Sequence, residues 1–320
     1  MAKKKPSQKK RPRKTASKTR KQNHLTTYLL KAFTGIGVLI VLVVLAALVA
    51  HHMISRKYPL EPVAKPQTIN IPRFEIYPKE EIIPRKIIPK PTPTLPEQLP
   101  KIAIIVDDLG YDKYIVEKFL ALDAALTFSV LPHIPYQKRI ANAAFEKGFE
   151  IMLHLPMEPD EFPKIDPGPG ALLSSMFPDE LIDQLNKNID TVPFVKGVNN
   201  HMGSKMTKIS TQLYQIFSVL KKRNLFFIDS LTTTESLCKP SARLLRVPFA
   251  QRDVFLDHIQ DPDFIHQQFN RLIQIAETHG EAIGIAHPYH VTFEVLSKLI
   301  PELKKKAILV PASEVVHIIG

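Results

Sequence analysis

Short apolar runs alternate with amphipathic stretches along the chain from residue 101 onward. A short, continuous apolar run is typical of a parallel strand that is buried on both faces. Eight such runs are predicted to be strands: KIAIIVDD, LTFSVLP, FEIMLHLP, VKGVNNHMG, LFFIDS, VPFAQRD, AIGIAHP and AILVPAS.

Helical patterns lie between several of these strands. The clearest begins at Asp261 and Pro262, which suit a helix cap and a first helical turn, and it ends at Gly280. Similar periodicity predicts helices over residues 136–147, 179–190 and 211–223. Seven or eight strand-then-helix units without a GxGxxG or P-loop motif favour an α/β fold closed into a (β/α) barrel over a dinucleotide-binding sheet.

The first hundred residues have a different pattern. Residues 32–50 carry no charge and consist mainly of Leu, Val, Ile and Ala, which is enough to cross a hydrocarbon core about 30 Å thick. We therefore predict a transmembrane helix at residues 32–53. A cleaved signal peptide is the alternative, but the apolar run is long and no clear small-x-small cleavage site follows it.

A basic tail precedes this apolar segment. Residues 1–60 contain 14 Lys or Arg and no acidic residue, and eleven of the basic residues come before Gln22. By the positive-inside rule, residues 1–31 are expected to form a cytoplasmic tail and the chain after Met53 is expected to be exported. The expected location is the bacterial inner membrane, with a single span and the folded domain in the periplasm or outside the cell.

A proline-rich segment follows the predicted span. Eleven prolines occur between Pro59 and Pro100, and they prevent regular helical or central-strand hydrogen bonding. Residues 54–100 are therefore predicted to be a semi-rigid spacer or a disordered tether. Residues 101–320 are enough for one domain with its own core.

The formal net charge of +12 comes from the N-terminal tail, because the chain after residue 60 carries 29 basic and 31 acidic residues. A basic groove in the folded part is not supported, so no nucleic-acid partner is expected. Cys238 is the only cysteine, which excludes an internal disulfide and a cysteine metal cluster. Any metal site must use histidine and carboxylate ligands.

Titratable residues stand at or just after the ends of most predicted strands. In a (β/α) barrel these ends converge on one face, where catalytic groups collect. Random placement of such residues would not follow strand ends, so this regularity is the strongest functional signal in the sequence. The residues are Asp107, Asp108, His133, His154, His201, Asp229, Asp253, Asp257 and His287.

These residues also have structural interpretations. Asp107 or Asp108 fits a helix cap, and His154 and His201 fit buried core histidines. Together, however, Asp108, His154 and His201 form a set of two histidines and one carboxylate that leaves metal positions open for water and substrate. The imidazole of His287 suits a proton donor at the same rim.

Three further residues are predicted to bind substrate, namely His133, Asp229 and Arg252. Arg252, Asp253 and Asp257 lie close together in the sequence. Ion pairing between Arg252 and Asp253 or Asp257 explains these three residues about as well as catalysis does.

The chain resembles the divergent polysaccharide deacetylase family, which is distantly related to the chitin and peptidoglycan deacetylases. The motifs IIVDDLG, LPH, HLPME, NNHMGS, FIDS, RDVFLD and IGIAHP occur in the family's order between Lys101 and about Val316. The resemblance implies a distorted (β/α) barrel. It also implies that Asp107 acts as general base, that Asp108 binds the metal and that His287 acts as general acid. Asp253 is expected to orient His287 or a neighbouring group.

The chain departs from the better-known relatives at one metal ligand. Those relatives use two histidines four residues apart, whereas Glu158 stands four residues after His154. Either Glu158 or His201 is expected to be the third metal ligand, and we favour His201.

The favoured function is a hydrolase that removes N-acetyl or O-acetyl groups from a polysaccharide with water activated by a divalent metal, for which zinc is favoured. A weakly active or inactive glycan-binding module on the same barrel is one alternative. A glycoside hydrolase with two catalytic carboxylates is another.

Overall fold

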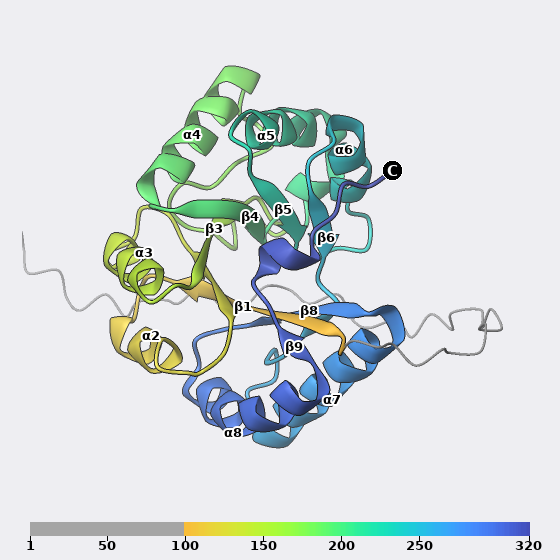
Figure 1. The fold of residues 1–320 in the computed structure, drawn as a ribbon. Helices are drawn as coiled ribbons and strands as arrows, with labels where there is room; N and C mark the ends of the chain where they lie inside the picture. The colour runs from red at the N-terminus through yellow and green to blue at the C-terminus, as the bar shows by residue number, and fades with distance from the viewer. Residues whose placement is uncertain (1–98) are drawn as a thin grey trace, which may run out of the picture. The chain divides into compact units, whose positions relative to one another are not determined.

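The computed structural model describes residues 99–320, in which strands and helices alternate (Figure 1). The strands are β1 (Lys101–Leu109), β2 (Leu126–Val130), β3 (Glu150–Met157), β4 (Val195–Met202), β5 (Phe226–Asp229), β6 (Phe249–Gln251), β7 (Val254–Phe255), β8 (Glu281–Ala286) and β9 (Ile308–Leu309). The helices are α2 (Lys113–Phe119), α3 (Gln137–Glu146), α4 (Pro178–Thr191), α5 (Ser210–Lys222), α6 (Cys238–Leu245), α7 (Pro262–His279) and α8 (His290–Lys306), with 3-10 helices η1 (Met206–Lys208) and η2 (Ala312–Val315).

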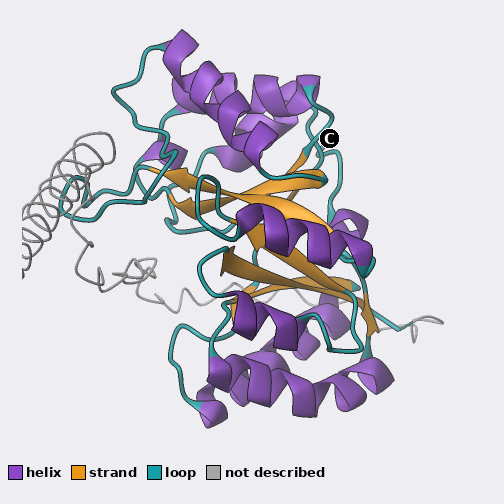
Figure 2. Cartoon of the chain, turned by 90° about the vertical axis from the view of Figure 1, so that its left-hand side faces the viewer, coloured by secondary structure: helices purple, strands orange, loops and turns teal. Residues whose placement is uncertain are grey.

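The strands form one sheet in the order β6-β5-β4-β3-β2-β1-β8-β7, with β9 beside β1. Every strand pair in this sheet is parallel. The strands occupy the centre, and the helices are arranged around them (Figures 1 and 2). The predicted parallel α/β fold is therefore confirmed.

The sheet is interrupted between β6 and β7. The predicted strand VPFAQRD contains only β6, and β7 was not predicted. The backbone N–H of Arg252 donates to the carbonyl of Asp229 (3.0 Å), whereas that of Asp253 donates to the carbonyl of Ile283 (2.9 Å). The chain thus crosses here from the edge formed by β5 to the edge formed by β8. Within residues 99–320 the sheet has nine strands rather than seven or eight, and it curls without a ladder between β6 and β7.

The curled sheet buries an apolar layer on each face. Side chains of one strand parity, such as Ile104 and Phe128, pack against the surrounding helices. Those of the other parity, such as Ile105 and Ile283, fill the inside together with Val315 of η2. Because successive strand residues alternate between the two faces, this pattern determines which face each later residue occupies.

The helix boundaries agree with the sequence signals. Asp261 accepts a hydrogen bond from the backbone N–H of Phe264 (2.9 Å), Pro262 is the first helical residue, and Gly280 ends α7 with a φ of 86°. The predicted helices at 136–147, 179–190 and 211–223 correspond to α3, α4 and α5.

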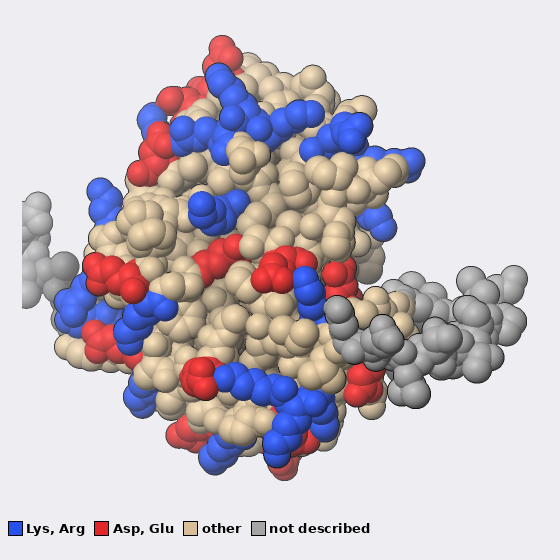
Figure 3. Space-filling model, in the orientation of Figure 1, with Lys and Arg blue, Asp and Glu red and all other residues tan. Residues whose placement is uncertain are grey.

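Acidic and basic side chains are interspersed over much of the face in Figure 3, with a run of basic side chains over α5 and α6. No helix within residues 99–320 is long and apolar enough to span a membrane. The predicted basic tail (1–31), transmembrane helix (32–53) and nearly all of the linker (54–100) lie outside the described residues.

Candidate metal centre

Polar side chains replace the inner apolar layer near the carboxyl ends of the central strands. Asp107 continues the inward parity of Ile105 on β1, and His154 continues that of Met152 on β3. A parallel sheet brings such strand ends to one edge, so these polar groups meet inside the curl. The buried polar side chains of this group are Asp107, Ser129, His154, Asn199, His201, Ser230 and His287.

A β-bulge turns the two consecutive aspartates toward the same space. A regular strand would direct Asp107 and Asp108 to opposite faces. The β1–β2 register shifts between Val106 and Leu109, so that two residues of β1 stand opposite one residue of β2. Asp108 has a φ of 55°, a left-handed conformation that Asp tolerates better than most residues. A bulge of this kind commonly redirects a side chain beside an active site.

Neither of these aspartates caps the following helix. Asp112 accepts hydrogen bonds from the backbone N–H groups of Tyr114 (2.8 Å) and Ile115 (3.4 Å) at the start of α2. The capping interpretation of Asp107 and Asp108 is therefore wrong, because Asp112 caps α2.

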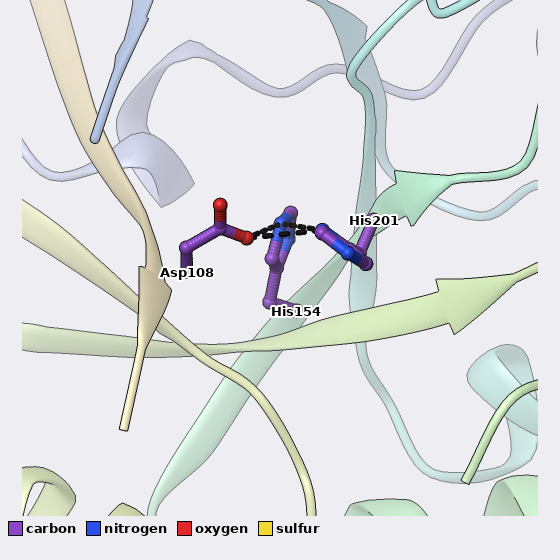
Figure 4. Close-up of side chains that lie close together, drawn as sticks. All are labelled: Asp108, His154 and His201. Carbon is purple, nitrogen blue, oxygen red and sulfur yellow. Dashed lines mark hydrogen bonds and ion pairs between the residues drawn. The ribbon is translucent and has the colours of Figure 1, made fainter. Parts of the chain in front are cut away.

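Asp108, His154 and His201 point toward one another from β1, β3 and β4 (Figure 4). Asp108 Oδ1 lies 3.2 Å from His154 Nε2 and 3.0 Å from His201 Nδ1. The two imidazole nitrogens lie 3.1 Å apart. These three side chains form the group of possible metal ligands found within residues 99–320.

The three side chains fit a divalent metal ion. Asp108 Oδ1, which faces both imidazole nitrogens, is buried without a regular hydrogen bond within residues 99–320. A tetrahedral ion with bonds of about 2.0–2.2 Å holds its ligand atoms about 3.3–3.6 Å apart, which is close to the separations present here. The donor set of one carboxylate and two imidazoles suits zinc and several other divalent metals.

Glu158, the other candidate for the third ligand, is engaged elsewhere. Its Oε1 lies 2.6 Å from Lys205 Nζ, and its other oxygen accepts a hydrogen bond from the backbone N–H of Ser174. Burial would raise the pKa of this carboxyl, but its hydrogen bonds to Lys205 and Ser174 hold the pKa below its ordinary value. Glu158 therefore joins the loop after β3 to the loop after β4.

The environments of the two aspartates differ. Burial raises the pKa of Asp107, while the charges of His154 and His287 and a hydrogen bond from Asn199 oppose that rise. Burial would also raise the pKa of Asp108, but His201 and His154 hold it well below its ordinary value. Asp108 is thus the carboxylate that remains an anion most readily.

His287 is held by Asp257. Asp257 Oδ1 lies 2.8 Å from His287 Nδ1, and its Oδ2 accepts from the backbone N–H of His287 (2.6 Å) and from the Thr292 hydroxyl (2.8 Å). The sequence expectation gave this role to Asp253, whose Oδ2 instead accepts from the backbone N–H of Ile283 (2.9 Å). The correction follows from the break after β6, which places Asp253 at the base of β7 and Asp257 beyond its end.

Two of the residues predicted to bind substrate, His133 and Arg252, contact other groups than Asp108, His154 and His201. His133 Nε2 lies 2.9 Å from Asn188 Oδ1 of α4. Arg252 donates to the carbonyls of Ser230 (2.7 Å) and Leu231 (3.2 Å). Their roles in substrate binding stay predictions.

The side chain of Asp229 points outward from β5, away from the inner apolar layer. Phe226 and Ile228 belong to the inner apolar layer, so Asp229 faces the other side of the sheet. Its carboxylate accepts from the Ser236 hydroxyl (2.6 Å) just before α6. The expectation that Asp229 faces the barrel mouth is not met.

Asn199 is a site residue that the sequence interpretation missed. It donates to both carboxylate oxygens of Asp107 (2.9 Å each), and its Oδ1 lies 3.1 Å from His154 Nδ1. The available signal was its position two residues before His201, which places both side chains on one face of β4.

Comparisons with known proteins agree with this architecture. Residues 104–316 match the family described as divergent polysaccharide deacetylase. The chain is 34% identical over 217 residues to the uncharacterized protein YibQ of Escherichia coli K12, covering 68% of this chain and 67% of that protein. It is 32% identical over 196 residues to an uncharacterized protein of Haemophilus influenzae, covering 61% and 69% of the two chains.

A solved structure has the same fold. The crystal structure of the uncharacterized protein ATU2773 from Agrobacterium tumefaciens C58 superposes with a TM-score of 0.66 at 27% identity, covering 70% of this chain and 92% of that chain. The family match covers two thirds of the chain and nearly all of the folded region. The chain belongs to the divergent polysaccharide deacetylase family.

Proposed function

We propose that this protein is a metal-dependent hydrolase that removes N-acetyl or O-acetyl groups from a polysaccharide. One observation carries the proposal: Asp108 Oδ1, His154 Nε2 and His201 Nδ1 lie within 3.2 Å of one another in a mostly buried site. A second carboxylate and a histidine held by its own carboxylate lie beside them. Family membership supports the substrate class.

Asp108, His154 and His201 would hold one divalent metal ion, for which zinc is favoured. When bound, such an ion supplies positive charge that polarises an acetyl carbonyl and lowers the pKa of a water molecule. His154 and His201 come from the adjacent parallel strands β3 and β4. His201 pairs with Pro156, which lies two residues after His154 on β3. The ligand positions are therefore fixed by the sheet rather than by a loop.

Asp107 would take a proton from the attacking water. Its carboxylate is fully buried, and Asn199 donates to both oxygens, so its position is fixed before substrate binds. Burial raises its pKa, and a carboxylate with a raised pKa is the better proton acceptor near neutral pH.

His287 would protonate the departing amine or alcohol. Its Nε2 lies 4.0 Å from Asp108 Oδ2 and so faces the same space. Its Nδ1 lies 2.8 Å from Asp257, which stabilises the protonated ring and fixes its orientation. Asp107 and His287 thus provide a base and an acid at one metal site.

We further propose that residues 32–53 anchor the chain in the inner membrane, with residues 54–100 as a spacer and the folded domain outside the cytoplasm. The sequence pattern supports this placement, because the basic residues precede the apolar segment. Fusion of a periplasm-sensitive reporter after residue 320 tests the orientation, and a cytoplasmic signal contradicts it.

Acetate release tests the activity. The purified full-length protein, incubated with zinc and with N-acetylated or O-acetylated oligosaccharides, should release acetate, and a chelator should stop the reaction. His201→Ala should abolish release, whereas the exposed His266→Ala on α7 serves as a matched control and should not.

Two outcomes contradict the proposal. Shortened oligosaccharides without acetate would identify a glycoside hydrolase, which mass spectrometry separates from a deacetylase. Saturable glycan binding with no bound metal and no acetate would identify a binding module.

A further inference from the structure

An apolar groove lies between the neighbouring helices α5 and α6. It has a volume of about 480 Å³, and its lining includes Tyr214, Leu237, Pro240, Leu244 and Leu245. Tyr214 is 49% exposed and Leu244 is 71% exposed. Single exposed apolar residues are common, but apolar side chains that gather in one groove are typical of a binding surface.

Basic side chains continue this groove toward the C-terminal ends of both helices. Lys221 follows Tyr214 by two helical turns, and Lys222 follows Gln215 of the groove lining by the same spacing, so each pair shares one side of α5. Lys221 Nζ donates to the carbonyl of Leu245 at the end of α6 (2.7 Å). These residues belong to the run of basic side chains over α5 and α6 in Figure 3, and the exposed basic residues of α6 and its C-cap are Lys239, Arg243 and Arg246.

The charges on this surface are mostly not neutralised by carboxylates. A basic residue in the last turn of a helix is common because it interacts favourably with the helix dipole, so its sign alone indicates no function. At the end of α8, Lys304 pairs with Asp123 and Lys306 pairs with Glu302, each at 2.7 Å. On α5 and α6, Arg223 pairs with Asp190, but the other exposed basic residues have no carboxylate partner within residues 99–320; these are Lys221, Lys222, Lys239, Arg243 and Arg246.

The basic ends of α5 and α6 lie away from the metal centre. Each helix connects two consecutive parallel strands, so it runs from the carboxyl ends of the strands back to their amino ends. The metal centre is at the carboxyl ends, whereas β1 begins with Lys101 at the amino end. The chain therefore enters the folded domain at the same end of the sheet as these basic residues.

We propose that this α5–α6 surface, made of the apolar groove and the basic residues at its end, contacts an anionic phospholipid bilayer. Lysine and arginine attract lipid phosphates, while exposed aromatic and aliphatic side chains enter the membrane interface. The inference goes beyond the proposed hydrolysis and takes from the proposed anchor only the nearness of a bilayer. Contact at this end would leave the metal centre open to a polysaccharide.

A polarity-sensitive fluorophore on the surface tests the contact. Leu244→Cys in the full-length protein provides the labelling position, because the native Cys238 is fully buried. The protein is placed in nanodiscs of phosphatidylcholine, alone or mixed with phosphatidylglycerol. Emission should shift to the blue in the anionic nanodiscs only, and salt at about 1 M should remove the shift because it screens charges beyond about 3 Å. A label at His266→Cys, on the exposed side of α7, should not respond.

Two double variants separate the unpaired charges from charge in general. Lys222→Gln with Arg243→Gln removes two unpaired charges, whereas Lys304→Gln with Lys306→Gln removes two that have carboxylate partners. A basic residue near an anionic bilayer contributes about fivefold to binding, so the first pair should weaken the contact about 25-fold. The second pair should change it little, because α8 lies across the sheet from α5 and α6 (Figure 1). The label at Leu244→Cys gives the contact equilibrium across a series of phosphatidylglycerol contents.

An unshifted label in anionic nanodiscs overturns the inference, and so does an equal shift in both lipid compositions. A shift with a glutamate-rich amphipathic peptide but not with lipid would instead assign the surface to an acidic protein partner. If Leu244→Cys does not fold, Tyr214→Cys carries the label. If the chain is not anchored, the labelled protein added to vesicles of the two compositions gives the same readout. Failure of the anchor or of acetate release therefore leaves the result interpretable.

Discussion

Replacing Asp257 by asparagine should separate the positioning of His287 from the folding of the barrel. The carboxylate of Asp257 is fully buried and accepts from three donors, which are the backbone N–H of His287 (2.6 Å), its Nδ1 (2.8 Å) and the Thr292 hydroxyl (2.8 Å). An asparagine has the same shape but presents one oxygen and one NH₂. It can satisfy the backbone N–H and the hydroxyl only by turning its NH₂ toward Nδ1.

The magnitude follows from this mismatch. An NH₂ group facing Nδ1 forces the proton onto Nε2 and removes the anion that stabilises the protonated ring. Loss of general acid catalysis should lower kcat by about 10²- to 10⁴-fold, equivalent to about 3–5 kcal/mol. The weakened hydrogen bonding at a buried site should lower the free energy of unfolding by about 1–3 kcal/mol.

Initial rates of acetate release against substrate concentration, together with urea unfolding, measure both effects. KM should change little because His287 acts on the leaving group. Asp253→Asn is the matched control, since its carboxylate bonds the backbone N–H of Ile283, and it should keep kcat within a few-fold of the wild type. The reasoning is refuted if Asp257→Asn retains the wild-type kcat, or if Asp253→Asn loses as much.

Three other predictions concern stability. Zinc at about 100 times its dissociation constant should raise the free energy of unfolding by about 2.7 kcal/mol, and His201→Ala should abolish this increase in a thermal melt. Glu158 has a lowered pKa in the folded state, so its ion pair with Lys205 should stabilise the protein at neutral pH and lose that contribution as the pH falls below about 4.5. Glu158→Gln should therefore destabilise by about 1–3 kcal/mol at pH 7 but little at pH 3 in urea unfolding, and an equal loss at both pH values would contradict the assignment. Gly197→Ala should destabilise by about 1–3 kcal/mol, because a Cβ there would lie 2.2 Å from the Phe226 ring, and unchanged urea unfolding would disprove the clash.

The sequence predicted the parallel α/β fold because most of the strands are buried apolar runs and because α3, α4, α5 and α7 follow amphipathic patterns. The three proposed ligands were also predictable, because parallel strand ends meet at one edge of the sheet. Strand parity would further have placed Asp229 on the outer face, since Phe226 and Ile228 point inward. That signal was present in the sequence and was not used.

Other features of the site depend on backbone geometry that apolar patterns do not encode. RDVFLD contains two aspartates, and the partner of His287 depends on where the chain crosses between two sheet edges. The bulge at Asp107 and Asp108 is hidden for a similar reason, because consecutive strand residues are expected to face opposite sides. Asn199 escaped notice because an uncharged amide becomes informative only when its partners are known.

The bulge explains how one strand can supply two aspartates with different chemistry. Asp107 receives both hydrogen bonds from a neutral amide, and burial raises its pKa, so it is suited to taking up a proton. Asp108 faces two imidazoles that hold its pKa low, so it is suited to remaining an anion beside a cation. Pairs of carboxyl groups whose surroundings drive their pKa values apart commonly divide acid–base and electrostatic roles between them. A left-handed φ of 55° at Asp108 is the conformational cost of placing that pair in one site, and it is incurred at the point where the proposed reaction needs both groups.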